Sequence, residues 1–119
     1  MKKIFHVDNS EFFRKQMKSF LEKEGFEVES FENASEANMI IGGGGADMVI
    51  MGLTFTDADG EEFFSKIRES YAGPVIVISS SVNKTNERKL LSLGAKVAID
   101  KSGHWQESLM PHLEALKKG

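Results

Sequence analysis

The sequence predicts an α/β protein in which one five-stranded parallel sheet is covered by helices on both faces. Two observations lead to this prediction. Five short apolar runs alternate along the chain with segments whose apolar residues recur at helical spacing, a pattern typical of repeated strand–helix units. The runs at residues 48–51 and 75–78 are apolar throughout, as expected for central strands that are buried on both faces. We therefore expect a three-layer, doubly wound (βα)5 fold.

The first two strand–helix units follow directly from the local pattern. Residues 4–7 form an apolar run, and the helix after it spans residues 10–25, where a glycine ends it. Apolar and polar residues alternate over residues 26–31, which predicts a strand near an edge of the sheet with one wetter face. An Asn–Glu capping pair opens the next helix, at residues 33–42, and a glycine again ends it.

The remaining three units are predicted in the same way. Their strands are expected at residues 48–51, 75–78 and 97–99. Asp59 can cap the helix after the first of these strands, and the helix after the second is capped by Asn83 and ended by Gly94. Pro111 falls in the last helix, where we expect it either in the first turn of a late-starting helix or at a kink.

The size and composition of the chain narrow the class of protein. Its 119 residues suit one compact domain, and we predict a single domain over residues 1–119. The formal net charge of −3 and the pI near 5.6 argue against nucleic acid binding as the main role. The chain has no cysteine, and no apolar run approaches the ~20 residues that span a bilayer. We predict a cytoplasmic protein that binds neither nucleic acid nor membrane.

Four of the predicted strands end in residues that would meet at one end of the sheet. Asp8 and Asn9 follow the first strand, Gly52 follows the third, Ser79 ends the fourth and Lys101 follows the fifth. In an open parallel sheet, ligands bind in the crevice at the carboxyl ends of the strands. We therefore expect the functional site among these residues.

At these positions the sequence resembles the receiver (CheY-like) domain of two-component response regulators. The matching stretches are residues 4–10, 47–60, 74–81 and 93–101, which occur in order over nearly the whole chain. The resemblance implies a flavodoxin-like fold with strand order 2-1-3-4-5. It also implies a role in phosphorelay signal transduction rather than an enzymatic activity.

The resemblance gives each residue at this end of the sheet an expected role. In the family, two acidic residues after the first strand hold a divalent metal, and an Asp at the end of the third accepts a phosphoryl group from a histidine kinase. A Ser or Thr after the fourth strand and a Lys after the fifth contact the phosphoryl oxygens. Here Asp8, Ser79 and Lys101 match, whereas Asn9 replaces the second acid and Gly52 replaces the acceptor. Glycine has no side-chain oxygen, so phosphorylation at Gly52 is impossible.

Three further positions depart from the family pattern. Ala98 stands where the family usually has an aromatic side chain that changes rotamer on activation. Thr56 and Ser102 stand where the family often has Pro. Together with Asn9 and Gly52, these departures favour drift of the whole site over a single engineered change.

The expected pocket has few ligands for a magnesium ion. Magnesium is usually held through one or two carboxylates together with waters and substrate phosphates, and the candidates here are Asp8, Asn9 and the Thr54 carbonyl. We expect weak or no magnesium binding and no other cofactor. We also expect Lys101 to occupy the space left by the missing acceptor and to pair with Asp8.

Other candidate groups have structural explanations. Asp59 is predicted to be a helix cap and Asp57 a solvated turn residue, so neither is favoured as a substitute acceptor. His6, in the first strand, is expected to be a core or half-buried residue with its hydrogen bonds satisfied. Trp105, at the start of the last helix, is expected to plug the edge of the core in preference to anchoring a partner.

Together, the residues and the resemblance predict a pseudo-receiver: a receiver domain that binds proteins without being phosphorylated. By analogy of fold, its partner would dock on the fourth helix, the fifth strand and the last helix. The predicted face comprises Lys84, Asn86, Glu87, Arg88, Lys96, Ala98 and Trp105. We expect a histidine kinase or another signalling protein as the partner, with a homodimer through the same face as an alternative.

Two other functions stay open. One is a phosphorelay response regulator that uses a substitute acceptor or carries an altered acceptor site at Gly52. The other is a flavin- or nucleotide-binding enzyme built on the same kind of sheet. The second is disfavoured, because Asp8 and Glu11 after the first strand would repel a phosphate group.

Overall fold

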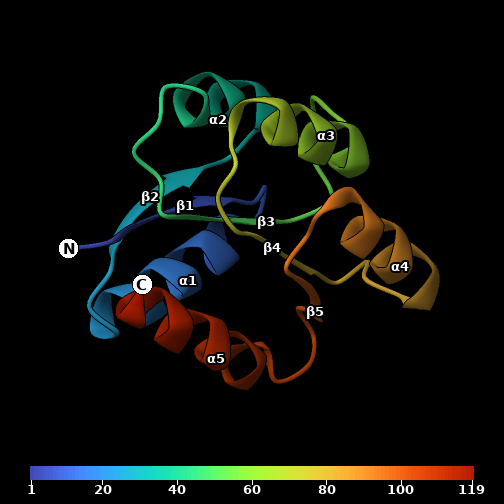
Figure 1. The fold of residues 1–119 in the computed structure, drawn as a ribbon. Helices are drawn as coiled ribbons and strands as arrows, with labels where there is room; N and C mark the ends of the chain where they lie inside the picture. The colour runs from blue at the N-terminus through green and yellow to red at the C-terminus, as the bar shows by residue number, and fades with distance from the viewer.

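Strands and helices alternate along the whole chain (Figure 1). The computed structural model describes residues 1–119. The strands are β1 (Lys3–Val7), β2 (Glu27–Phe31), β3 (Met48–Met51), β4 (Val75–Ser79) and β5 (Val97–Asp100). The helices are α1 (Glu11–Lys23), α2 (Ala34–Ile41), α3 (Gly60–Ser70), α4 (Lys84–Leu93) and α5 (Trp105–Lys118). Every predicted strand–helix unit is therefore present, at bounds close to those expected.

The five strands form one parallel sheet in the order β2-β1-β3-β4-β5. This order confirms the one that the resemblance implies, and it places the alternating strand β2 at an edge, as predicted. In Figure 1, α2, α3 and α4 cover one face of the sheet, and α1 and α5 cover the other. Because all the strands run the same way, their carboxyl ends lie together at one end of the sheet.

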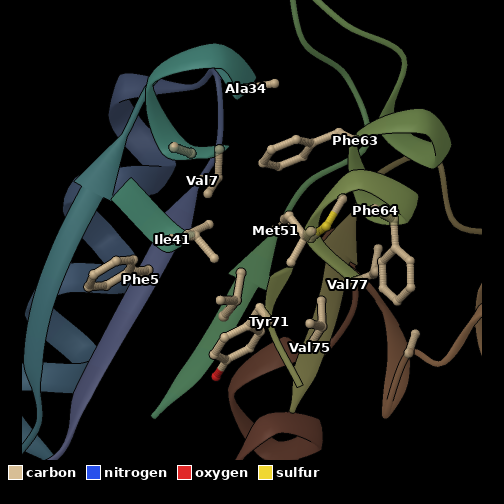
Figure 2. Packing of buried hydrophobic residues seen from close by; sticks show 14 of the residues in the cluster. Phe5, Val7, Ala34, Ile41, Met51, Phe63, Phe64, Tyr71, Val75 and Val77 are labelled. Atoms are coloured by element: carbon tan, nitrogen blue, oxygen red, sulfur yellow. The ribbon is translucent and has the colours of Figure 1, made fainter. Parts of the chain in front are cut away.

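The sheet separates two hydrophobic clusters, because successive side chains of a strand point to opposite faces. Phe5 and Val7 of β1 belong to the cluster beneath α2, α3 and α4, whereas Ile4 belongs to the cluster beneath α1 and α5. Figure 2 shows the first cluster, to which α3 contributes Phe63 and Phe64. The central strands β3 and β4 are buried along their full lengths, as their continuous apolar runs predict.

Side-chain caps define the helix ends as the sequence predicts. Asn33 and Asp59 each accept a hydrogen bond from the backbone N–H three residues further on, at 3.0 and 3.2 Å. Asn83 and Asn86 form a reciprocal capping box at the start of α4. That helix ends at Gly94, whose φ of 114° lies in the left-handed region that favours glycine.

Two alternatives were predicted for Pro111 in the last helix. It lies in the middle of α5, which excludes the first turn and leaves the kink as a prediction. A proline inside a helix cannot donate to the carbonyl four residues earlier. Both Pro111 and Glu107, the residue with that carbonyl, are exposed, so water can satisfy the freed oxygen. Neither α5 nor any other helix is long and apolar enough to cross a membrane.

Candidate functional site

The candidate site is a small pocket at the carboxyl ends of β1, β3, β4 and β5. Its cavity has a volume of about 50 Å³. The residues that line it are Asp8, Asn9, Gly52, Leu53, Thr54, Ser79, Ser80 and Lys101. All six residues that the sequence analysis assigns to the pocket are therefore brought together. The parallel sheet explains the assembly, since these strand ends meet at a single end of the sheet.

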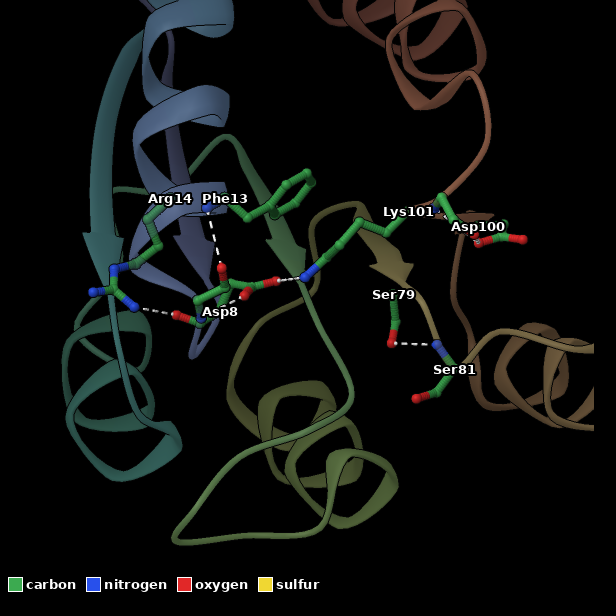
Figure 3. Close-up of polar contacts among 9 residues, drawn as sticks. Asp8, Phe13, Arg14, Ser79, Ser81, Asp100 and Lys101 are labelled. Atoms are coloured by element: carbon green, nitrogen blue, oxygen red, sulfur yellow. Dashed lines mark hydrogen bonds and ion pairs between the residues drawn. The ribbon is translucent and has the colours of Figure 1, made fainter.

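Asp8 is the centre of the polar contacts in the pocket (Figure 3). It is only 2% exposed. Its Oδ2 lies 3.0 Å from Nζ of Lys101, and its Oδ1 accepts a hydrogen bond of 2.8 Å from the backbone N–H of Ser10. The backbone carbonyl of Asp8 accepts a hydrogen bond of 2.7 Å from the Arg14 guanidinium. The predicted ion pair between Lys101 and Asp8 is therefore confirmed.

The ion pair lies directly beside Gly52. A Cβ atom added at Gly52 would come 3.0 Å from Oδ2 of Asp8, the oxygen that contacts Lys101. The ammonium group of Lys101 also lies 4.3 Å from the centre of the Phe13 ring, a distance that suits a cation–π interaction. Lys101 is therefore held by a buried carboxylate on one side and an aromatic face on another.

The Ser79 hydroxyl takes part in the turn that follows β4. Ser79 is 5% exposed, and its Oγ accepts a hydrogen bond of 3.1 Å from the backbone N–H of Ser81 (Figure 3). The carbonyl of Ser81 in turn accepts a hydrogen bond of 2.8 Å from the side chain of Asn86. These hydrogen bonds link the end of β4 to the first turn of α4 and so hold the loop between them in place.

The residues of the pocket do not fit the two-acid magnesium site of the resembling family. Asp8 is the single carboxylate, and both of its oxygens already have partners, Lys101 and Ser10. Asn9 and Thr54 are exposed. No group of three His, Cys, Asp or Glu side chains in the chain is arranged to hold a metal ion. A cation would have to compete with Lys101 for Asp8.

Asp57 tethers the loop after β3 to the start of α2. Its Oδ1 accepts a hydrogen bond from the backbone N–H of Ala34, and its Oδ2 accepts bonds from the backbone N–H and hydroxyl of Ser35, at 2.7–3.1 Å. The hydrogen bond from the Ser35 hydroxyl is the main cause that lowers the pKa of Asp57. Asp57 is exposed in a bend, as predicted, but its hydrogen bonds to the start of α2 were not predicted. No local signal could reveal the tether, because its partners lie more than 20 positions away.

His6 is buried without a hydrogen-bond partner. It is 1% exposed, and neither ring nitrogen has a partner, so the expectation of satisfied hydrogen bonds is wrong. The ring packs edge to face against Phe13, with 5.6 Å between centroids. Burial lowers the pKa of His6 to about 4; nearby Asp8 opposes this shift, and Lys101 adds to it. The neutral ring therefore behaves as part of the hydrophobic cluster beneath α1.

The predicted partner face needs two corrections. Trp105 is 5% exposed and packs edge to face on Phe13 and Phe20, which confirms its core role and removes it from the face. Ala98 is 7% exposed and belongs to the cluster beneath α4, because its side chain points inward from β5. The other face residues are exposed or half-exposed: Lys84, Asn86, Glu87, Arg88 and Lys96.

The comparisons with known proteins agree with the fold. The family described as "Response regulator receiver domain" matches residues 4–113. The chain belongs to this family. It is a receiver domain of two-component signalling, as the resemblance implied.

Solved receiver structures share the whole fold at low sequence identity. A two-component response regulator from Clostridium difficile superposes with a TM-score of 0.90 at 22% identity, over 99% of this chain and 97% of that one. A CheY-like receiver domain protein from Methanospirillum hungatei JF-1 gives a TM-score of 0.89 at 24% identity, over 99% and 95% of the two chains. These similarities support the fold.

One curated relative is much longer than this chain. The transcriptional regulatory protein SrrA of Staphylococcus aureus is 27% identical over 92 residues. The match covers 77% of this chain and 38% of SrrA. The chain thus spans well under half of the length of the curated relatives that it matches.

Proposed function

We propose that this receiver domain acts as a protein-binding or regulatory module that works without phosphorylation. The observation that carries the proposal is Gly52 at the end of β3. An acyl phosphate needs a carboxylate oxygen, and a glycine at the acceptor position has none. Beside it, Lys101 pairs with Asp8, the carboxylate that a working receiver would offer to a metal ion.

The state of the neighbouring groups supports the same proposal. A working site uses the Lys101 ammonium to contact phosphoryl oxygens, but here that ammonium is paired with Asp8. The Ser79 hydroxyl accepts from the backbone N–H of Ser81, and the Ser81 carbonyl accepts from the Asn86 side chain, so the end of β4 is linked to α4. We infer a domain that stays in one state and presents a constant surface. We propose that it binds little or no magnesium, and that it acts in the cytoplasm on a histidine kinase or another signalling protein.

Phosphorelay through a substitute acceptor has less support. The first carboxylates that follow Gly52 in the sequence are Asp57 and Asp59. Both oxygens of Asp57 accept hydrogen bonds from the start of α2, and Asp59 caps α3. Phosphorylation of either residue would break contacts that hold a helix terminus.

The thermal stability of the domain with magnesium and beryllofluoride tests the proposal. Beryllofluoride mimics a phosphoryl group by binding an acceptor carboxylate with a divalent metal beside it. We expect no change in melting temperature for the natural chain. The matched variant N9D/G52D restores both missing carboxylates and should gain stability on addition of magnesium and beryllofluoride. A comparable gain in the natural chain would contradict the proposal, because it would reveal a functional acceptor.

A further inference from the structure

A second cavity, of about 300 Å³, lies at the opposite end of the sheet from the candidate site. It is formed where β1, β3, β4 and β5 begin and where the second half of α5 packs beside them. Lys2 and Gly119 both line it, so the two ends of the chain approach each other there (Figure 1). The two cavities share no lining residue. A cavity of this size lies at the lower end of the range that holds small organic ligands.

The second cavity is lined by basic side chains that have no partner. Lys2, Lys96 and His112 line it, and none of the three forms a hydrogen bond or an ion pair through its side chain. The one acidic side chain in the lining is Asp47, whose Oδ2 accepts a hydrogen bond of 2.8 Å from the backbone N–H of Lys3. The charge that stays unbalanced is therefore positive, which favours an anionic ligand.

Lys96 and His112 mark the place of the negative charge. Burial lowers the pKa of His112, and nearby Lys96 adds to this shift, so the two groups lie within electrostatic range. A carboxylate between them would accept hydrogen bonds from the ammonium and from an imidazole N–H. The carbonyls at the end of α5 carry partial negative charge, which is felt within the last turn. We therefore expect the carboxylate beside His112, away from Gly119.

One wall of the second cavity is apolar. Met48, which is 2% exposed, and the half-buried Leu116 line it together with Pro74. These side chains donate no hydrogen bond to a polar ligand, but hydrocarbon that packs on them is removed from water. An ion as small as acetate would leave this wall uncovered. The lining therefore matches a molecule with a negative charge at one end and hydrocarbon at the other.

We propose that the second cavity binds a small amphipathic carboxylate, an organic acid with a short hydrocarbon chain. Its carboxylate lies between Lys96 and His112, and its chain packs on Met48 and Leu116. The inference goes beyond the proposed function, because it adds a small-molecule ligand at the end of the sheet that the Asp8 pocket does not occupy.

A nuclear magnetic resonance titration of the whole chain with hexanoate tests this inference. We expect saturable shifts of the backbone amide signals, centred on Met48, Lys96 and His112. A bound carboxylate stabilises the protonated imidazole, so hexanoate should raise the pKa of His112 and bind more tightly as the pH falls. The other charged groups around this imidazole in the cavity are Lys2, Lys96 and Asp47.

The other two histidines are internal controls in the same spectra. His6 is buried beneath α1, and His104 lies at the far end of α5, so hexanoate should leave the pKa of both unchanged. Two related probes test the chemistry of the ligand. Acetate has the charge without the chain, and hexylammonium has the chain with the opposite charge. Each should bind at least ~10-fold more weakly than hexanoate.

Substitutions in the lining test the placement of the ligand. K96Q and H112Q should each weaken hexanoate binding about fivefold or more, and A115F should weaken it by filling part of the cavity. The matched controls K118Q and H104Q change a lysine and a histidine that do not line the cavity and should bind hexanoate as the natural chain does. All five positions are exposed or half-exposed, so every variant should melt close to the natural chain.

Four results would overturn the inference. They are the absence of a saturable shift with hexanoate, shifts centred on another part of the chain, equal binding of acetate or hexylammonium, and unchanged hexanoate binding in both K96Q and H112Q. The second cavity and the Asp8 pocket lie at opposite ends of the sheet. None of these results changes the outcome of the beryllofluoride test, so failure of this inference and failure of the proposed function are distinguishable.

Discussion

The pocket end of the sheet and the core beneath it are stabilised in different ways. The core consists of two apolar clusters of 17 and 13 buried residues, packed on the two faces of the sheet. The pocket is held by a few polar contacts, chiefly those of Asp8 and Ser79, and the loop after β3 is held by Asp57. Gly52, at the proposed acceptor position, borders the second region. The proposed loss of phosphorylation chemistry is therefore compatible with an intact fold.

Truncation in the core should have the largest effect. Phe64, on the inner face of α3, is fully buried. The substitution F64A should lower the free energy of unfolding by about 3–5 kcal/mol, because it removes apolar burial and leaves a cavity. Urea denaturation followed by circular dichroism measures this change. The matched variant F12A removes the same side chain from an exposed position and should change stability by less than about 0.5 kcal/mol. Equal losses in the two variants would contradict the description of the core.

Acid should destabilise the protein through His6, which lies where the core meets the pocket. The unfolded histidine takes up a proton near the ordinary histidine pKa of 6.5, whereas the folded one has a pKa of about 4. Stability is therefore retained above pH 6.5 and lost as the pH falls toward 4, by about 3 kcal/mol from this group.

The H6F variant isolates this effect. It should lose much less stability over the same pH range, because Phe cannot be protonated. His112, whose pKa is also lowered by burial, stays in both proteins and contributes equally. Unfolding curves at a series of pH values measure the difference, and parallel pH profiles for the two proteins would refute the role of His6.

Removal of Lys101 and removal of Asp8 should lower the stability of the protein by different amounts. K101M leaves the carboxylate of Asp8 buried without a cation and should cost about 2 kcal/mol, less than for a fully buried pair because Lys101 is 24% exposed. D8N leaves only a lysine that can turn toward water and should cost about 1 kcal/mol. Chemical denaturation of both variants at neutral pH gives the two values. A larger loss for D8N would show that Asp8 is not held by Lys101.

The smallest effect should come from the turn between β4 and α4. N83A removes the side chain that caps α4 through the backbone N–H groups of Thr85 and Asn86. The expected cost is about 1 kcal/mol, with faster amide hydrogen exchange confined to the first turn of α4. Faster exchange over the whole sheet would instead mean that this turn contributes to the core.

The same contrast explains which features the sequence predicted. The core follows from periodicity, so the strand positions, the edge location of β2 and the burial of β3 and β4 were predictable from local patterns. The pocket residues were predictable because strand ends in a parallel sheet meet, and the pairing of Asp8 with Lys101 followed from their charges.

The contacts that the sequence did not predict depend on tertiary structure. The tether from Asp57 to Ser35 joins two loops far apart in sequence, and no local pattern signals it. The missing hydrogen bonds of His6 depend on which apolar groups surround it. The inward direction of Ala98 depends on the packing of α4 against β5. In each case the sequence identified the residue but not its neighbours.

Intact mass spectrometry after incubation with magnesium and a small-molecule phosphodonor tests the central claim most directly. The proposal predicts that the natural chain gains no mass, while the variant N9D/G52D, treated in parallel, gains the mass of one phosphoryl group. A stoichiometric gain in the natural chain would contradict it. Peptide mapping would then show whether Asp57, Asp59 or Asp8 carries the group, and the domain would be a working phosphorelay element after all.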